Sequence, residues 1–109
     1  MFSFPTFATA VAVLTVLHRS ADARNVSNVL IYSATAGFRH DSIPTAVQAM
    51  SDRAANYGIN FVNTEDRTRF NDEYLSQFDA LFFLHTTGDV LDRAGEAAFQ
   101  RYLDNGGNF

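Results

Sequence analysis

The chain has no cysteine and no lysine among its 109 residues. The lack of cysteine excludes a disulfide framework, a thiolate metal site and a cysteine nucleophile. The lack of lysine excludes a phosphate-binding loop of the Gly-Lys-Ser/Thr type. Acidic residues outnumber basic ones by 12 to 8, and the net charge of −4 makes nucleic acids and anionic membrane surfaces poor partners. A chain of this length predicts one domain, which must be stabilised by its apolar core.

Apolar runs are short as well. The run over residues 7–17 has 11 residues, too few to span a bilayer, and is typical of the central segment of a signal peptide. Small residues at Ala21 and Ala23 supply a cleavage site. We therefore expect residues 1–23 to be a signal peptide and residues 24–109 to be secreted and free of the membrane; a short N-terminal anchor is the alternative. Asn25 opens an Asn-Val-Ser triplet and is a candidate glycosylation site.

Strands are predicted at three places. Nearly continuous apolar runs over residues 28–33 and 79–85 indicate strands buried on both faces, and residues 59–63 indicate a shorter strand between them. Residues 108–109 would begin a fourth strand.

Helices are predicted between these strands. Over residues 43–57 the apolar side chains recur every three or four positions, which predicts one buried stripe ending at Tyr57. Ser42 is the expected N-cap, Pro44 falls in the first turn and Gly58 ends the helix. A short helix or turn is expected over residues 71–78. A further helix should run from an Asp92 cap to about Asn105, before the stop at Gly106-Gly107.

This alternation predicts a parallel sheet with right-handed crossovers, as in a flavodoxin-like three-layer α/β sandwich. Ligands of such sheets bind beyond the carboxyl ends of the strands, so the functional loops should be residues 33–44, 64–66 and 85–89. The first loop has a single glycine, Gly37, which excludes a dinucleotide fingerprint. Binding of a flavin phosphate by Ser33, Thr35 and Gly37 ahead of the helix stays open as an alternative.

The first loop carries an aromatic ring, a guanidinium, an imidazole and a carboxylate in a row. The imidazole of His40 makes it a candidate acid/base or metal ligand, while Arg39 could hold a carboxylate or a sugar hydroxyl. Asp41 could orient His40 or begin the helix cap. The structural alternative is that Phe38 packs under the sheet rim, Arg39 pairs with Asp41 and His40 binds a backbone carbonyl.

The third loop, residues 85–89, combines hydroxyls, a glycine and a carboxylate, which suits recognition of a polyhydroxylated ligand. The first and third strands are commonly adjacent in this topology, so we expect Asp89 to lie near His40. The alternative is a polar turn that starts the next helix. His85 is as compatible with a core position as with a ligand role, and Glu65 with Asp66 is interpreted as a solvated loop end.

Four segments combine into a more specific pattern: VLIYSATAGFRHDSIP, TEDRTRFN, FDALFFLHTTGDVL and FQRYLDNGGNF. The pattern, over residues 29–109, resembles the ThuA-like (trehalose utilisation) family. The resemblance implies a fold similar to class I glutamine amidotransferases and a role in the metabolism of trehalose or related disaccharides. In that family about half of the domain follows the Gly-Gly pair. We therefore expect residues 24–109 to be the N-terminal half of a ThuA-like domain, a fragment truncated after about three strands.

The prediction is a secreted protein of carbohydrate metabolism whose partner is a sugar or glycoside, acting by hydrolysis, isomerisation or lyase-type proton transfer. The expected catalytic residues are His40 and Asp89. By resemblance, the substrate-binding positions are Phe38, Arg39, Thr87 and Gly88. The motifs identify no cofactor or metal, and two other classes stay open: a non-catalytic carbohydrate-binding module and an inactive truncated product. An unpaired sheet edge would favour pairing between copies of the chain.

Overall fold

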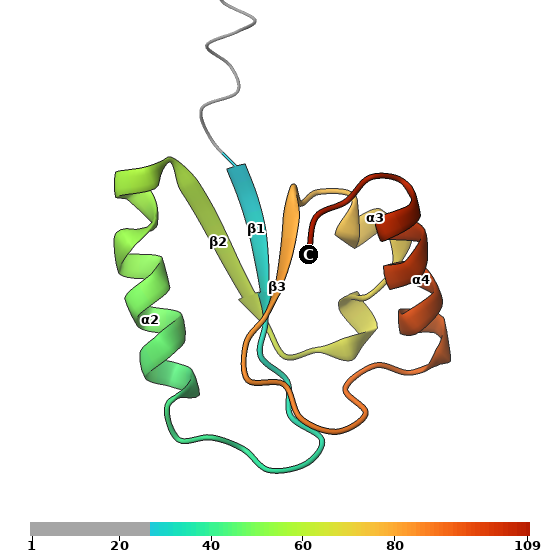
Figure 1. Cartoon of the computed structure of the whole chain (residues 1–109), viewed down its shortest axis with the longest axis horizontal. Helices are drawn as coiled ribbons and strands as arrows, with labels where there is room; N and C mark the ends of the chain where they lie inside the picture. Colours follow the sequence, from blue (N-terminus) through green and yellow to red (C-terminus); the bar gives the residue numbers. More distant parts are fainter. Residues whose placement is uncertain (1–26) are drawn as a thin grey trace, which may run out of the picture.

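Three parallel strands form the centre of a computed structural model that describes residues 27–109 (Figure 1). They are β1 (Ser27–Tyr32), β2 (Ile59–Thr64) and β3 (Ala80–Phe83), in the sheet order β2-β1-β3. The α/β arrangement predicted from the sequence is confirmed. The expected signal peptide at residues 1–23 and the Asn25 triplet lie outside the described residues.

The central strand explains the apolar run at the start of the fold. Residue Val29 of β1 pairs with Phe61 of β2 and with Ala80 of β3, so β1 has a neighbour on each side. Leu30, Ile31 and Tyr32 are fully buried. Because successive side chains point to opposite faces, a run without polar alternation requires that both faces be covered.

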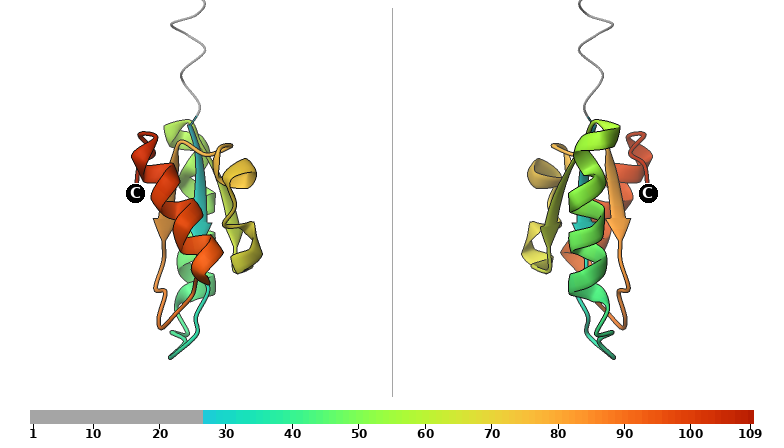
Figure 2. Two further views of the ribbon diagram at one scale, coloured as in Figure 1. Left: turned by 90° about the vertical axis from the view of Figure 1, so that its right-hand side faces the viewer. Right: turned by 90° about the vertical axis from the view of Figure 1, so that its left-hand side faces the viewer.

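Helices cover both faces and make three layers (Figures 1 and 2). One side holds α2 (Ile43–Ala54), which continues into the 3₁₀ turn η1 (Ala55–Tyr57). The other side holds η2 (Arg67–Arg69), α3 (Asp72–Leu75) and α4 (Arg93–Asp104).

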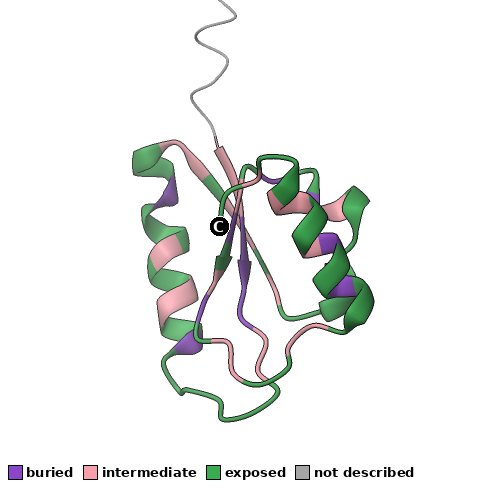
Figure 3. Cartoon of the chain, turned by 45° about the vertical axis from the view of Figure 1, so that its right-hand side comes forward, coloured by how far each residue is buried: buried purple, intermediate pink, exposed green. Residues whose placement is uncertain are grey.

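The main core lies between the sheet and the second helical layer. Its buried members are Leu30, Tyr32, Phe70, Leu75, Phe78, Leu81 and Ala98. Aromatic rings fill much of this space: the Tyr32 and Phe70 centroids lie 4.6 Å apart, and Phe83 stacks on Phe99 at 5.2 Å. Burial is concentrated on the strands and the inner helix faces, and much of the loop region beyond the carboxyl ends of the strands is exposed (Figure 3).

The predictions about the first helix are confirmed in part, because the N-cap residue is correct and the burial of Tyr57 is wrong. Ser42 stands at the N-cap position, but its helical backbone (φ −77°, ψ −9°) leaves its side chain without a capping bond. Tyr57 is 71% exposed instead of buried. The helix tightens into η1 at Ala55, and a turn of three residues rotates Tyr57 away from a stripe set by 3.6 residues per turn. The predicted stop at Gly58 is confirmed by its left-handed φ of 66°.

The end of the chain follows the sequence prediction closely. Asp92 caps α4 by accepting a hydrogen bond from the Gly95 amide at 2.8 Å. After α4, Asn108 forms a parallel bridge to Ala80, and its carbonyl accepts from the Leu81 amide at 2.9 Å. A fourth strand therefore begins beside β3, as expected. Within residues 27–109 the helices are too short or too polar to cross a membrane.

Candidate functional site

The loops after β1 and β3 are tied together beyond the carboxyl ends of their strands. The Thr87 carbonyl accepts hydrogen bonds from the Ala36 amide at 2.8 Å and the Gly37 amide at 3.2 Å. In return the Thr87 hydroxyl donates to the Phe38 carbonyl at 2.6 Å. These bonds extend the parallel pairing past the sheet through a bridge between Thr35 and Thr87. The two loops, residues 33–44 and 85–89, therefore form one continuous structure, which we call the rim.

Gly88 allows this close approach. Its φ of +72° lies in the left-handed region, and an added Cβ would lie 3.0 Å from the Gly37 nitrogen and 3.2 Å from the Ala36 Cβ. A side chain at this position would push the two loops apart. The glycine expected at a binding position thus has a clear role in the packing of the rim.

Two imidazoles and an aromatic ring gather on the open side of the rim. The His40 ring lies 4.8 Å from the His85 ring and 4.9 Å from the Phe38 ring, measured between centroids. All three residues are exposed, Phe38 by 71%, so the interpretation that Phe38 packs under the rim is wrong. His85 has a φ of 50°, which lies in the left-handed region that few residues other than glycine adopt.

Arg39 pairs with Glu65 instead of Asp41. Its Nη1 and Nη2 atoms donate to Oε1 and Oε2 of Glu65 at 2.9 and 2.8 Å, and Nη1 also reaches the Thr35 hydroxyl at 3.3 Å. The hydrogen bonds from Arg39, with one from Ser33, lower the pKa of Glu65, and the same contact raises the pKa of Arg39. Glu65, a carboxylate interpreted from the sequence as a solvated loop end, is therefore bonded to the first loop, and the rim from here on includes residues 64–66.

Sequence reasoning missed Glu65 although the chain held a usable signal. In the order β2-β1-β3, the loop after β2 lies beside the loop after β1, so a carboxylate there can reach Arg39. The neighbouring Asp66 does match the loop-end interpretation. Its carboxylate is half-exposed and accepts from the Thr68 amide and hydroxyl at 3.0 and 2.7 Å, which lowers the pKa of Asp66 and starts η2.

A hollow of about 200 Å³ opens in the rim on the side of Asp89. Asp89 shares its lining with Glu65, Arg67 and Thr35, so residues with two carboxylates, a guanidinium and a hydroxyl lie at the hollow. The buried Tyr32 hydroxyl donates to the Val90 carbonyl and fixes the chain next to Asp89. Burial raises the pKa of Tyr32, which keeps this hydroxyl a donor. His40 does not line the hollow; its aromatic neighbours are His85 and Phe38.

The donor set does not favour a flavin phosphate or a metal ion. The Ser33 hydroxyl donates to the Glu65 carboxylate, and the Arg39 guanidinium that contacts the Thr35 hydroxyl is already paired with the same carboxylate, so a phosphate at this loop would meet a negative charge. Among residues 27–109, no three His, Asp or Glu side chains converge as metal ligands would.

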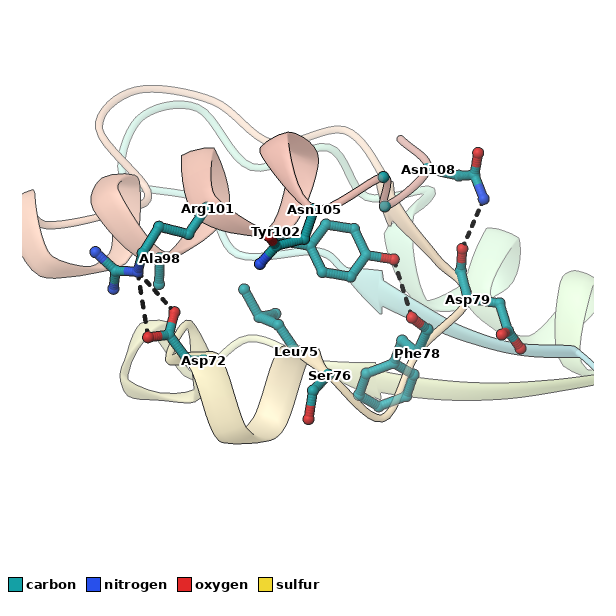
Figure 4. A pocket seen from close by; sticks show the side chains of 12 residues that line it. Asp72, Leu75, Ser76, Phe78, Asp79, Ala98, Arg101, Tyr102, Asn105 and Asn108 are labelled. Carbon is teal, nitrogen blue, oxygen red and sulfur yellow. Dashed lines mark hydrogen bonds and ion pairs between the residues drawn. The ribbon is translucent and has the colours of Figure 1, made fainter.

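A larger hollow of about 600 Å³ lies between α3 and α4, away from the rim (Figure 4). Its polar groups are largely paired with one another. Arg101 binds Asp72 at 2.9 Å, and the Tyr102 hydroxyl donates to the Phe78 carbonyl at 3.0 Å. Because few polar groups are left to orient a ligand, the rim is the better candidate site although its hollow is smaller.

Fold and site together define an α/β protein with a polar rim at the carboxyl ends of its parallel strands. The model of the ThuA family, described as trehalose utilisation, matches residues 28–109, and the chain belongs to this family. The resemblance inferred from the sequence is thereby confirmed. Neither the curated proteins nor the solved structures that were compared gave a match to the chain.

Proposed function

We propose that the protein binds trehalose or a related glycoside at the rim and transfers a proton to or from it. The observation that carries this proposal is the contact between the His40 and His85 rings, whose centroids lie 4.8 Å apart, beside the exposed ring of Phe38. Membership of a family described as trehalose utilisation supports a sugar as the ligand. An aromatic ring suits the apolar C–H face of a sugar, and imidazoles suit its hydroxyls.

His40 is the proposed acid/base residue. A neutral imidazole has one nitrogen that accepts a proton and one that donates, so it can serve as a base or as an acid. With His85 in contact, one ring can hold a proton while the other accepts one. Such a pair can serve hydrolysis, isomerisation or lyase-type elimination, because each of these needs a proton moved to or from an oxygen or carbon of the sugar.

The hollow beside Asp89 is the proposed position for sugar hydroxyls. Carboxylates such as Asp89 accept hydrogen bonds from hydroxyls, and the Arg67 guanidinium donates to their oxygens. Opposite charges around one hollow suit a neutral, polyhydroxylated ligand better than an ion of either sign.

The test is a titration of the ¹⁵N-labelled chain with trehalose, followed by amide shifts and by the appearance of products. We expect shifts at residues 35–40 and 85–89, and a loss of affinity of about tenfold or more in His40→Asn and His85→Asn. Asn105→Ala, at the end of α4, is the matched control and should bind like the wild type.

The outcomes separate the remaining classes. Turnover that disappears in His40→Asn supports the acid/base role. Binding that survives His40→Asn without turnover by the wild type would indicate a non-catalytic carbohydrate-binding module. A chain that shows no shifts with trehalose or other glycosides would contradict the proposal.

We also propose that the protein is secreted, on the strength of the apolar run over residues 7–17 and the small residues before Arg24. The test is the mass of the protein isolated from the medium in which its source organism is grown. An amino terminus at Arg24, with or without a glycan on Asn25, is the expected result. An intact Met1 or exclusive retention in cells would contradict it.

A further inference from the structure

Glu65 connects three parts of the rim through one carboxylate. Its Oε2 accepts from the Ser33 hydroxyl at 3.2 Å, and both of its oxygens accept from Arg39. Ser33 is itself fully buried, and its hydroxyl accepts a hydrogen bond from Asn63 at 2.9 Å. The end of β1, the end of β2 and the loop that carries His40 therefore meet at Glu65.

The loop has few other attachments near His40. The Phe38 carbonyl is bonded to Thr87, and the His40 carbonyl accepts from the Ile43 amide at 3.3 Å. The Arg39 side chain lies between these two points. Paired N–H···O bonds between a guanidinium and a carboxylate restrict orientation as well as distance, so the pair with Glu65 fixes Arg39 in direction.

We propose that Glu65 is a positioning residue, which clamps Arg39 and so holds Phe38 and His40 in place. Arg39 then serves as the clamped group and not as a ligand of the sugar. The effect on sugar binding rests on the proposed function, whereas the effect on the loop does not. Glu65 acts through Arg39 and needs no contact with the sugar.

The first measurement is the backbone mobility of residues 38–41 by ¹⁵N relaxation in the full chain. Glu65→Gln keeps the shape of the side chain but places an NH₂ group against one nitrogen of Arg39. We expect order parameters near 0.85 in the wild type and below about 0.6 in Glu65→Gln. Asp72→Asn is the matched control, because it breaks the similarly exposed pair with Arg101 away from the rim.

A double-variant cycle shows whether Glu65 acts through Arg39. Arg39→Met should loosen residues 38–41 as Glu65→Gln does, and the combined variant should lose no more order than either single one. Lower pH should loosen the wild type more than Glu65→Gln, because only the wild type has the Glu65 carboxylate to protonate. The other charged or titratable groups near Glu65 and the loop, namely Asp66, Arg67, Asp89, His40 and His85, are present in both. The proposal would be overturned if the losses of order in the two single variants added up in the combined variant. It would also be overturned if residues 38–41 were as ordered in Glu65→Gln as in Asp72→Asn.

Trehalose affinity gives the second readout. We expect a loss of roughly three- to tenfold in Glu65→Gln, because the sugar must then order the loop as it binds. A wild type that binds no sugar contradicts the proposed function, and the relaxation data still decide the role of Glu65. A loosened loop with unchanged affinity would overturn the part of the proposal that concerns the site.

Discussion

At the scale of single residues, the packing of the rim depends on the absence of a side chain at Gly88. Gly88→Ala adds a methyl group 3.0 Å from the Gly37 nitrogen at a φ of +72°. We expect a loss of unfolding free energy of about 2 kcal/mol or more, from backbone strain together with crowding. Urea denaturation followed by circular dichroism measures this loss.

Gly106→Ala is the matched control. Gly106 also has a positive φ, +93°, but an added Cβ would have no neighbour within 4 Å. Its loss should be limited to the strain of the backbone, about 1 kcal/mol. Equal losses at the two glycines would show that crowding at the rim contributes nothing.

The sequence predicted which residues lie in the rim better than it predicted which residues they contact. The positions of His40 and Asp89 in loops at the carboxyl ends of strands followed from the order of strands and helices. The partner of Arg39 did not, because Glu65 lies 26 residues away and reaches it only through the pairing of β1 with β2. The left-handed backbone of His85, with a φ of 50°, is likewise not predicted by the residue type.

At the scale of elements, the two long helices begin in different ways. The Asp92 side chain accepts from the Gly95 amide at the start of α4, whereas the Ser42 side chain makes no such bond before α2. Asp92→Ala should therefore lower the free energy of unfolding by about 1 kcal/mol, and Ser42→Ala should change it little. Urea midpoints of the two variants make the comparison, and a larger loss in Ser42→Ala would contradict it.

β1 and β3 were predictable because they lie in nearly continuous apolar runs, and α2 because its apolar positions recur at helical spacing. The error at Tyr57 has a local cause. The sequence pattern continues to residue 57, but the backbone changes to a 3₁₀ turn at Ala55 before the left-handed Gly58. A pattern of apolar residues does not distinguish 3.6 from three residues per turn over so short a stretch.

At the scale of the whole molecule, β2 is an edge strand whose only partner among the described residues is β1. We propose that copies of the chain associate through this edge, because unpaired strand groups favour pairing. Sedimentation at increasing concentration should show dimers, and Asn60→Lys on β2 should reduce them by placing a charge there. Asn105→Lys adds the same charge just after the end of α4 and is the control. Equal association in both variants would contradict the use of this edge.

Acid stability is the other property that involves the whole molecule. The hydrogen bonds from Arg39 lower the pKa of Glu65 in the folded state, and those from Thr68 lower the pKa of Asp66. The unfolded chain therefore binds more protons at low pH than the folded chain does. The stabilisation is complete above the unfolded pKa values, about 4, and is lost as the pH falls through the lower folded values.

Urea midpoints of the wild type should consequently fall between about pH 5 and pH 3 more steeply than those of Glu65→Gln. Glu73→Gln is the control, because it removes the same charge from an exposed carboxylate of α3 that makes no side-chain hydrogen bond among the described residues. Its midpoints should follow the wild type. Curves for Glu65→Gln that run parallel to the wild type would show that the pair with Arg39 does not couple protons to folding, and would leave the acid response to the other carboxylates.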